Sequence, residues 1–221
     1  MCGRFTLNSS SEALAADFEL SEVPALEPRF NIAPSQEIIA VREDDAGVRE
    51  CVELRWGLIP SWTKDPKKSR APINARSETA AEKPSFRHAM SRARCLVPAS
   101  GFFEWQGKGG SKQPFLFRRR EGALFAIAGL CETLRGEGGE IIESVALLTT
   151  DANAVVAPVH PRMPVILMPA DYGRWLDCEN RDSASLADLM VPCGVEVLES
   201  FAVSTKVNNP RFDDPACLEA I

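Results

Sequence analysis

Hydrophobic and polar positions alternate with a period of two over several short stretches of the chain, which is the pattern of half-buried β-strands. Residues 37–59 contain two runs in which β-branched residues alternate or cluster around a DDAG turn, and they predict a β-hairpin. The sequence QGKGGSK, residues 106–112, favours a second hairpin loop. Further strands are expected in the apolar stretches at residues 94–105, 113–119, 123–131, 143–150, 163–169 and 195–205.

Helices are expected to be few and short. Ser9 followed by Glu12, ahead of Leu14 and Phe18, is typical of a capping box at a helix start. Helices are also expected over residues 77–90, with a proline break, 171–178 and 183–190, and the basic residues 60–72 should form an exposed loop. Strands that come in hairpin-joined groups predict an α+β fold with a mainly antiparallel sheet, and they argue against a doubly wound parallel sheet.

The composition favours one hydrophobic core. Of the 221 residues 45% are hydrophobic, and they are mixed with charged residues throughout, without a linker or a repeat. We therefore expect residues 1–221 to form a single domain. The start of the chain lacks the pattern of a secretion signal, and no apolar run approaches the roughly 20 residues that cross a bilayer. We expect a cytoplasmic protein without a membrane partner.

The net charge of −6 and the pI of about 5.1 argue against a protein that coats nucleic acid non-specifically. Two basic stretches are candidate local patches, although each is equally compatible with an ordinary solvated face. They consist of Lys64, Lys67, Lys68, Arg70 and Arg76, and of Arg92 and Arg94.

The chain has seven cysteines and two histidines, without a C-x-x-C pair or any other ligand spacing, so the sequence predicts no metal site. The glycine-rich motifs of nucleotide cofactors are absent from the sequence, and we expect no cofactor. Cysteines in a reducing compartment are usually small buried hydrophobes, which is the interpretation we favour for Cys51, Cys95 and Cys131. Cys2 differs from these cysteines because it lies at the start of the chain.

Cys2 follows Met1 directly, and its small size favours removal of Met1, which leaves a free N-terminal cysteine. An α-amine has a reference pKa of roughly 7.7–8.0, so about a quarter of it is unprotonated near neutral pH. It can attack an aldehyde to give a Schiff base, and the neighbouring thiol can then close a thiazolidine ring. A retained Met1 would block this chemistry. The alternative is that Cys2 has no chemical role and is simply a small residue that position 2 tolerates.

Two side chains are candidates for proton transfer. Glu104 lies in the aromatic, strand-like sequence GFFEW, where burial would raise the pKa of its carboxyl unless the side chain faces solvent. His160 lies between Pro158 and Pro161 in a stiff loop that can fix the direction of an imidazole, as it would for a structural histidine. His88 lies in a polar helical stretch and is expected at the surface.

Several further side chains are suited to contacts with an unpaired DNA strand. Asn74 and Arg76 precede a predicted helix, where an amide can orient a sugar oxygen and a guanidinium can bind a phosphate. Arg4 and Arg162 are candidates for further phosphate contacts. Trp62 lies in the expected loop and is either a stacking platform for a base or an anchor of that loop.

The residues that carry these predictions occur in a characteristic order, in which the chain resembles the SRAP family, the SOS-response-associated peptidases or abasic-site-processing proteins. The resemblance extends over residues 1–209 and depends on the joint occurrence of its blocks. They are Met1-Cys2-Gly3-Arg4, Asn31-Ile32-Ala33-Pro34, Trp56-Gly57-Leu58-Ile59-Pro60 with Trp62, Asn74-Ala75-Arg76 with Glu78-Thr79, Gly101-Phe102-Phe103-Glu104-Trp105, Thr149-Thr150, His160-Pro161-Arg162-Met163-Pro164, and Val203-Ser204 with Val207-Asn208-Asn209.

The resemblance implies an α+β fold, with a mainly antiparallel, barrel-like sheet and flanking short helices. It also implies a protein that senses abasic sites in single-stranded DNA and links itself to them through Cys2. We expect a monomer, with replication-fork proteins as further partners. Asn74 would position the adduct, Glu104 would act as acid or base near the α-amine, and His160 would do so on the sugar side. The implied DNA groove is lined by Arg4, Asn31, Pro34, Trp62, Arg76, Thr149 and Arg162.

Two other functions stay open. The family's older name and the set of Cys2, Glu104 and His160 indicate a cysteine peptidase, whose simplest version removes Met1 from its own chain. A non-catalytic module that binds single-stranded DNA would need Arg4, Trp62 and Arg76 but would be indifferent to Cys2.

Overall fold

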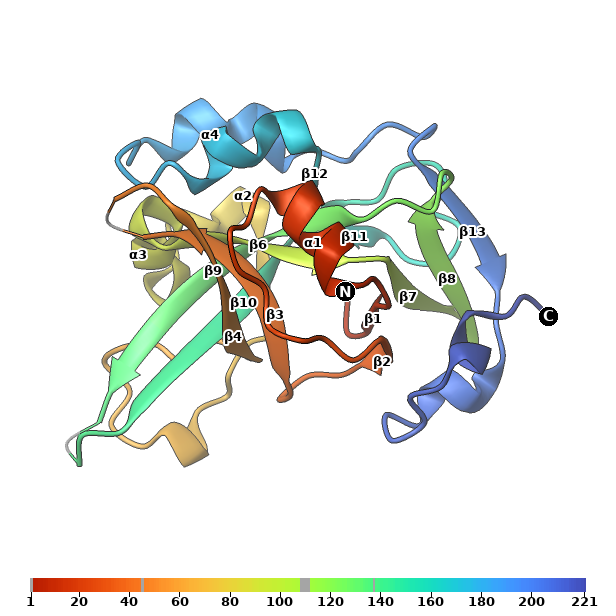
Figure 1. Ribbon diagram of the computed structural model, residues 1–221, viewed down its shortest axis with the longest axis horizontal. Coiled ribbons are helices and arrows are strands. Elements are labelled where there is room, and N and C mark those ends of the chain that lie inside the picture. The colour runs from red at the N-terminus through yellow and green to blue at the C-terminus, as the bar shows by residue number, and fades with distance from the viewer. Residues whose placement is uncertain (1, 45, 108–111, 137) are drawn as a thin grey trace.

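A closed β-barrel forms the centre of the computed structural model, which describes residues 2–44, 46–107, 112–136 and 138–221 (Figure 1). The barrel closes because β10 pairs with both β4 and β9. The β10–β4 pair is parallel and the other barrel pairs are antiparallel, so the predicted fold class is confirmed. In order around the barrel, the described strands are β10 (Ile141–Asp151), β4 (Arg49–Trp56), β3 (Glu37–Glu43), β6 (Arg94–Ala99) and β9 (Phe125–Arg135).

Short strands extend the barrel at one end of β10. β5 (Asn74–Arg76) runs parallel to β10 with Leu147 opposite Asn74, and β11 (Arg162–Pro164) runs antiparallel to it with Asp151 opposite Arg162. β12 (Ile166–Leu167) pairs with β9, so the predicted strand over residues 163–169 is divided into two. The last residues of β10 therefore lie between two strands that carry predicted site residues.

A second, antiparallel sheet packs beside the barrel. Its order is β13 (Leu198–Ala202), β8 (Gln113–Arg119), β7 (Gly101–Gln106), β1 (Phe5–Leu7) and β2 (Arg29–Ile32). The predicted strand over residues 94–105 is divided near Ser100, because β6 belongs to the barrel and β7 to this sheet. β7 and β8 pair up to Gln106 opposite Gln113, so the predicted hairpin is present, while residues 108–111 of its loop lie outside the described residues.

The helices are short and lie on the outside of the strands (Figure 1). Ser10 and not Ser9 caps α1, accepting a bond from the amide of Ala13 over 3.3 Å, so the predicted capping box is wrong by one residue. The predicted break before Pro84 is confirmed. No helix in the described ranges has the length and apolar character to cross a membrane. The described helices are α1 (Ser11–Phe18), α2 (Ser77–Ala80), α3 (Pro84–Arg92) and α4 (Tyr172–Leu176), with 3-10 turns at Pro66–Lys68, Pro169–Asp171, Ser183–Met190, Thr205–Asn208 and Pro215–Leu218.

The main core fills the barrel and the space between its strands and the helices. Trp56 and Phe5 meet edge to face in it, with ring centroids 5.3 Å apart. A smaller cluster, which includes Phe103, Leu116 and Val207, packs the chain's last segments onto the second sheet. The start of the chain is thereby held between the two cores, because β1 packs into the first and pairs with β7.

Candidate active site around Cys2

Cys2 is fixed between strands from both sheets. The carbonyl of Arg4 accepts a bond from the amide of Phe103 over 2.9 Å, which continues the β1–β7 ladder toward Cys2. On the other side, Nδ2 of Asn74 donates to the carbonyl of Cys2 over 2.8 Å. Cys2 is fully buried. Asn74 and Cys2, predicted to act together, are therefore in direct contact.

The surroundings of Cys2 keep its thiol protonated. Burial raises the pKa of this thiol to about 12, and the negative charge of Glu104 acts in the same direction. The Sγ atom lies 3.8 Å from the carbonyl oxygen of Arg4, to which a protonated thiol donates. This site favours a neutral sulfur over a thiolate.

Glu104 and His160 come together at this site, although they are 56 positions apart in the printed sequence. Glu104 on β7 is 3% exposed, and burial raises the pKa of its carboxyl while a charged His160 opposes the shift. Its Oε1 lies 4.0 Å from Nδ1 of His160. The predicted burial of Glu104 is confirmed, and the pair can exchange protons with a group bound beside Cys2.

The backbone of Arg162 sets the orientation of the His160 ring. The amide N–H of Arg162 donates to Nδ1 of His160 over 3.0 Å, a contact that fits a neutral ring with its proton on Nε2. The carbonyl oxygen of Arg162 also lies 3.0 Å from Nδ1 and can accept its proton when the ring is charged. Both protonation states of His160 therefore have a partner.

Asn74 retains hydrogen-bonding capacity after binding Cys2. Its Oδ1 is buried and has no hydrogen-bond partner among the residues that the structure describes. A buried acceptor without a donor is costly, by about 1–3 kcal/mol. A substrate hydroxyl beside Cys2 would satisfy it.

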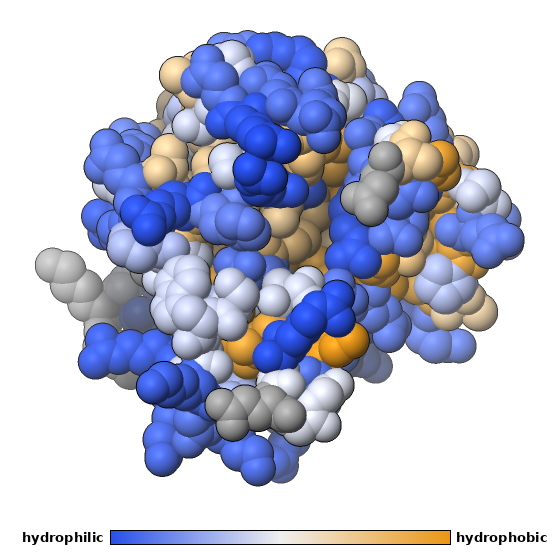
Figure 2. All heavy atoms as spheres, turned by 90° about the vertical axis from the view of Figure 1, so that its left-hand side faces the viewer, coloured by the Kyte–Doolittle hydropathy of each residue, from blue (hydrophilic) through white to orange (hydrophobic). Residues whose placement is uncertain are grey.

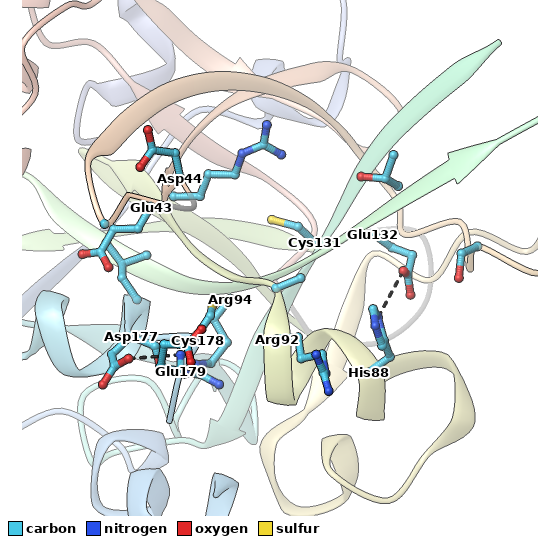
Figure 3. Close-up of a pocket in the computed structure, with 16 residues that line it drawn as sticks. Glu43, Asp44, His88, Arg92, Arg94, Cys131, Glu132, Asp177, Cys178 and Glu179 are labelled. Carbon is cyan, nitrogen blue, oxygen red and sulfur yellow. Dashed lines mark hydrogen bonds and ion pairs between the residues drawn. The ribbon is translucent and has the colours of Figure 1, made fainter. Parts of the chain in front are cut away.

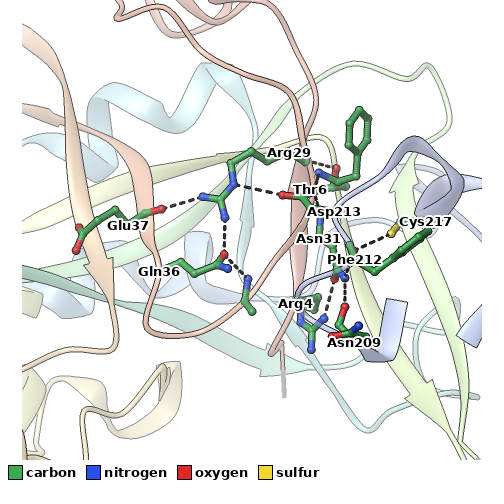
Figure 4. Close-up of polar contacts among 12 residues, drawn as sticks. Arg4, Thr6, Arg29, Asn31, Gln36, Glu37, Asn209, Phe212, Asp213 and Cys217 are labelled. Atoms are coloured by element: carbon green, nitrogen blue, oxygen red, sulfur yellow. Dashed lines mark hydrogen bonds and ion pairs between the residues drawn. The ribbon is translucent and has the colours of Figure 1, made fainter. Parts of the chain in front are cut away.

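Arg4 and Asn31, both predicted to line the DNA groove, hold the chain's last segment in place (Figure 4). Nη1 of Arg4 donates to Oδ1 of Asn31 over 2.7 Å and to the carbonyl of Val207 over 2.8 Å. Asn31 is fully buried, and its Nδ2 faces the carbonyls of Val207, Asn209 and Phe212. A DNA contact through Asn31 would require this network to open.

The other predicted groove residues differ in exposure. Arg76, at the end of β5, is exposed, and Trp62 has 56% of its surface exposed. Pro34 is half-buried. Thr149 is fully buried and donates to the carbonyl of Ala75 over 3.3 Å. Arg76 and Trp62 are thus accessible to DNA, whereas Thr149 acts within the fold.

Arg162 is already occupied by carboxylates. Its guanidinium binds Glu78 through two hydrogen bonds and Asp151 through one. Neither Glu78 nor Asp151 was predicted from the sequence as a site residue. Glu78 stands two residues after Arg76 in a block that resembles the SRAP family, but a linear sequence does not show its pairing across β10.

The predicted basic stretches differ in the structure. In the first, Lys64, Lys67, Lys68 and Arg70 are exposed. The face of the molecule shown in Figure 2 is mostly hydrophilic, with smaller apolar areas. The second is corrected, because Arg94 is 1% exposed and donates to backbone carbonyls, among them those of Met90 and Trp175. Arg94 is neither part of a patch nor on a solvated face.

A pocket of about 690 Å³ lies beside α3 and β9 (Figure 3). His88 is more than half exposed on its rim, as predicted, and its Nδ1 lies 3.4 Å from Oε1 of the buried Glu132. None of the predicted site residues is among those described as lining it. In the described ranges, no three His, Cys, Asp or Glu side chains gather in a way that could hold a metal ion.

Comparisons with known proteins agree with the resemblance seen in the sequence. Residues 1–210 match the family model described as SOS response associated peptidase (SRAP). Over 224 aligned residues, the chain is 38% identical to "Abasic site processing protein YoqW" of Bacillus subtilis, with both chains covered fully. It is 34% identical to "Abasic site processing protein HMCES" of Gallus gallus, over 82% of this chain and 61% of that protein.

Solved structures share the fold. A protein from Bacteroides thetaiotaomicron superimposes with a TM-score of 0.87 at 24% identity, over the whole of both chains. A protein from Bordetella bronchiseptica superimposes with a TM-score of 0.77 at 30% identity, over 92% of this chain and all of that one. The barrel and the second sheet are therefore a known architecture.

Proposed function

The chain belongs to the SOS response associated peptidase (SRAP) family, and from this premise and the surroundings of Cys2 we propose that it processes abasic sites in single-stranded DNA by linking itself covalently to them. The names of its relatives support the lesion as substrate. The observation that carries the chemistry is the placement of the buried Cys2 beside Asn74 and Glu104.

The proposed reaction begins once Met1 has been removed, which turns the nitrogen of Cys2 into a primary amine. This amine attacks the aldehyde carbon of the ring-opened abasic sugar and forms a carbinolamine. Loss of one water gives an imine, and addition of the Cys2 sulfur to the same carbon closes a thiazolidine ring while the thiol proton passes to the nitrogen. The net change is the loss of one water.

Each proposed role follows from a contact described above. Glu104, with its pKa raised by burial, takes the proton from the ammonium and returns one as water leaves. His160, whose ring is oriented by the amide of Arg162 at Nδ1, moves the proton of the sugar hydroxyl when the ring opens. The buried Oδ1 of Asn74, which has no partner among the described residues, accepts from the carbinolamine hydroxyl. Exposed Arg76 and Trp62 bind the strand.

The same geometry disfavours the rival cysteine peptidase. That chemistry needs a thiolate as the first nucleophile, and here burial and Glu104 raise the pKa of the thiol to about 12. A non-catalytic DNA-binding module is disfavoured because Arg4, one of the cations it would need, is engaged within the protein.

The test is denaturing gel electrophoresis with an oligonucleotide that carries one abasic site. Wild-type protein, with loss of Met1 confirmed by mass spectrometry, should give a heat-stable shifted band, and Cys2→Ala should give none. Acetylating the α-amine should also abolish the band. Attachment that survives either change would refute the proposal, and so would cleavage of an unrelated peptide panel by the amine-blocked protein.

A further inference from the structure

The Arg162 side chain reaches across the end of β10 and binds Glu78 on the other side. It is 15% exposed, and its Nη1 and Nη2 atoms bind the two carboxylate oxygens of Glu78 over 2.5 and 2.9 Å. Nη1 also binds Asp151 over 2.8 Å, and Nη2 binds the carbonyl of Thr149 over 2.7 Å. A two-bond guanidinium–carboxylate pair is the stronger and more directional kind of ion pair.

Arg162 is not free to bind a DNA phosphate, because carboxylates already bind its guanidinium. One guanidinium faces two carboxylates, and a DNA phosphate would have to displace one of them. Hydrogen bonding to Arg162 lowers the pKa of Glu78, so the carboxylate stays charged at neutral pH. Asp151 makes a single contact and is 81% exposed at its side chain, so Glu78 is the main partner.

The Glu78–Arg162 pair links the segment that follows Asn74 to the segment that follows His160. Glu78 lies on α2, which follows directly on β5 with Asn74. Arg162 lies on β11, and its backbone amide and carbonyl both face Nδ1 of His160. β5 and β11 each pair with β10 and not with each other, so the Glu78–Arg162 pair spans β10 between them.

We propose that Glu78 is a positioning residue, which fixes Arg162 and through its backbone the His160 ring relative to Asn74 and Cys2. The inference rests on the proposed function for the reaction that it serves, but the geometry it assigns to His160 can be measured without DNA. Without the Glu78 carboxylate the Arg162 side chain can rotate. The backbone of Arg162 is then held less firmly, and so is its amide, which keeps the neutral His160 ring with its proton on Nε2.

The first measurement is the tautomer of the two histidines by ¹⁵N NMR at a pH where both rings are neutral. The chain has only His88 and His160, so His88 serves as an internal reference and His160→Gln assigns the signals. Wild-type His160 should carry its proton on Nε2, and Glu78→Gln should give a mixture while His88 is unchanged. A wild-type tautomer in Glu78→Gln overturns the assignment, whatever DNA assays show.

The second measurement is the single-turnover rate of crosslinking over a range of pH. Glu78→Gln should slow it roughly tenfold and change its pH profile, since small misplacements of a reacting group are costly. Glu78→Asp, which retains a carboxylate, should recover part of the rate. In a His160→Ala background, Glu78→Gln should have no further effect. Equal slowing in both backgrounds would show that Glu78 acts independently of His160, and it would refute the proposal.

Asp188→Asn is the matched control, because Asp188 also binds an arginine, Arg174, through two bonds of 2.9 and 3.1 Å, on an exposed surface. It should leave the tautomers and the rate unchanged. Urea unfolding of each variant checks that it folds. If wild-type protein forms no crosslink while Glu78→Gln alters the tautomer, the proposed function fails and the positioning role of Glu78 stands.

Discussion

Replacing Asn31 with alanine separates a structural role from a DNA-binding one. Oδ1 of Asn31 accepts from the charged Arg4 over 2.7 Å, a bond of the kind that contributes about 1.5–3 kcal/mol. Its Nδ2 faces three carbonyls but carries only two hydrogens. It can therefore donate two neutral hydrogen bonds at a time, each of which contributes about 1 kcal/mol to stability. We expect Asn31→Ala to lower the free energy of unfolding by about 3–5 kcal/mol.

The assay is urea unfolding followed by tryptophan fluorescence, with Asn8→Ala as the control because Asn8 is an exposed asparagine. With a slope of about 2 kcal/mol per molar urea, the midpoint for Asn31→Ala should fall by about 2 M, and that for Asn8→Ala should stay near wild type. A wild-type midpoint combined with weaker binding of single-stranded DNA would refute our reasoning. It would show instead that Asn31 contacts DNA directly.

Two further predictions concern the groups at Cys2. Cys2→Ser keeps the amine but lacks the thiol, so it should form an imine that borohydride traps and heat destroys; a heat-stable band from this variant would rule out the thiazolidine. The folded protein raises the pKa of Glu104, so this carboxyl stabilises the fold below its ordinary pKa of about 4.5 and loses that contribution as pH rises through the folded value. Stability should therefore fall more steeply for wild type than for Glu104→Gln as the pH rises above about 4.5, and parallel curves in urea unfolding would contradict the shift.

The parts of the fold that could be predicted are those in which the pairing is local. β3 and β4 contain β-branched and other apolar residues on either side of a short turn, and their register runs without a break from Glu37 opposite Arg55 to Glu43 opposite Arg49. The strands that were missed, β1, β2 and β5, span three or four residues each. Such strands are too short to show a period, and tertiary pairing with distant strands stabilises them.

For the candidate site too, the sequence could predict some residues and not the roles of others. Cys2 and Glu104 could be selected because their chemistry is unusual for their place in the sequence, an N-terminal thiol and a carboxylate among aromatic residues. Asn31 and Arg162 were expected in the DNA groove because of their residue types, but a residue type does not show which partner it meets in space. Asn31 instead bonds a segment about 180 positions away, and Arg162 meets Glu78 across β10.

The burial of Cys2 itself orders the steps of the proposed reaction. With a pKa of about 12, the thiol is almost entirely protonated at neutral pH, whereas about a quarter of a free α-amine is unprotonated. The amine is therefore the first nucleophile. The sulfur becomes competitive only after an imine has formed beside it, because the reaction is then intramolecular and Glu104 can relay the thiol proton to the nitrogen as the bond forms. The burial that makes Cys2 a poor peptidase nucleophile thus suits it to the second step of a covalent linkage.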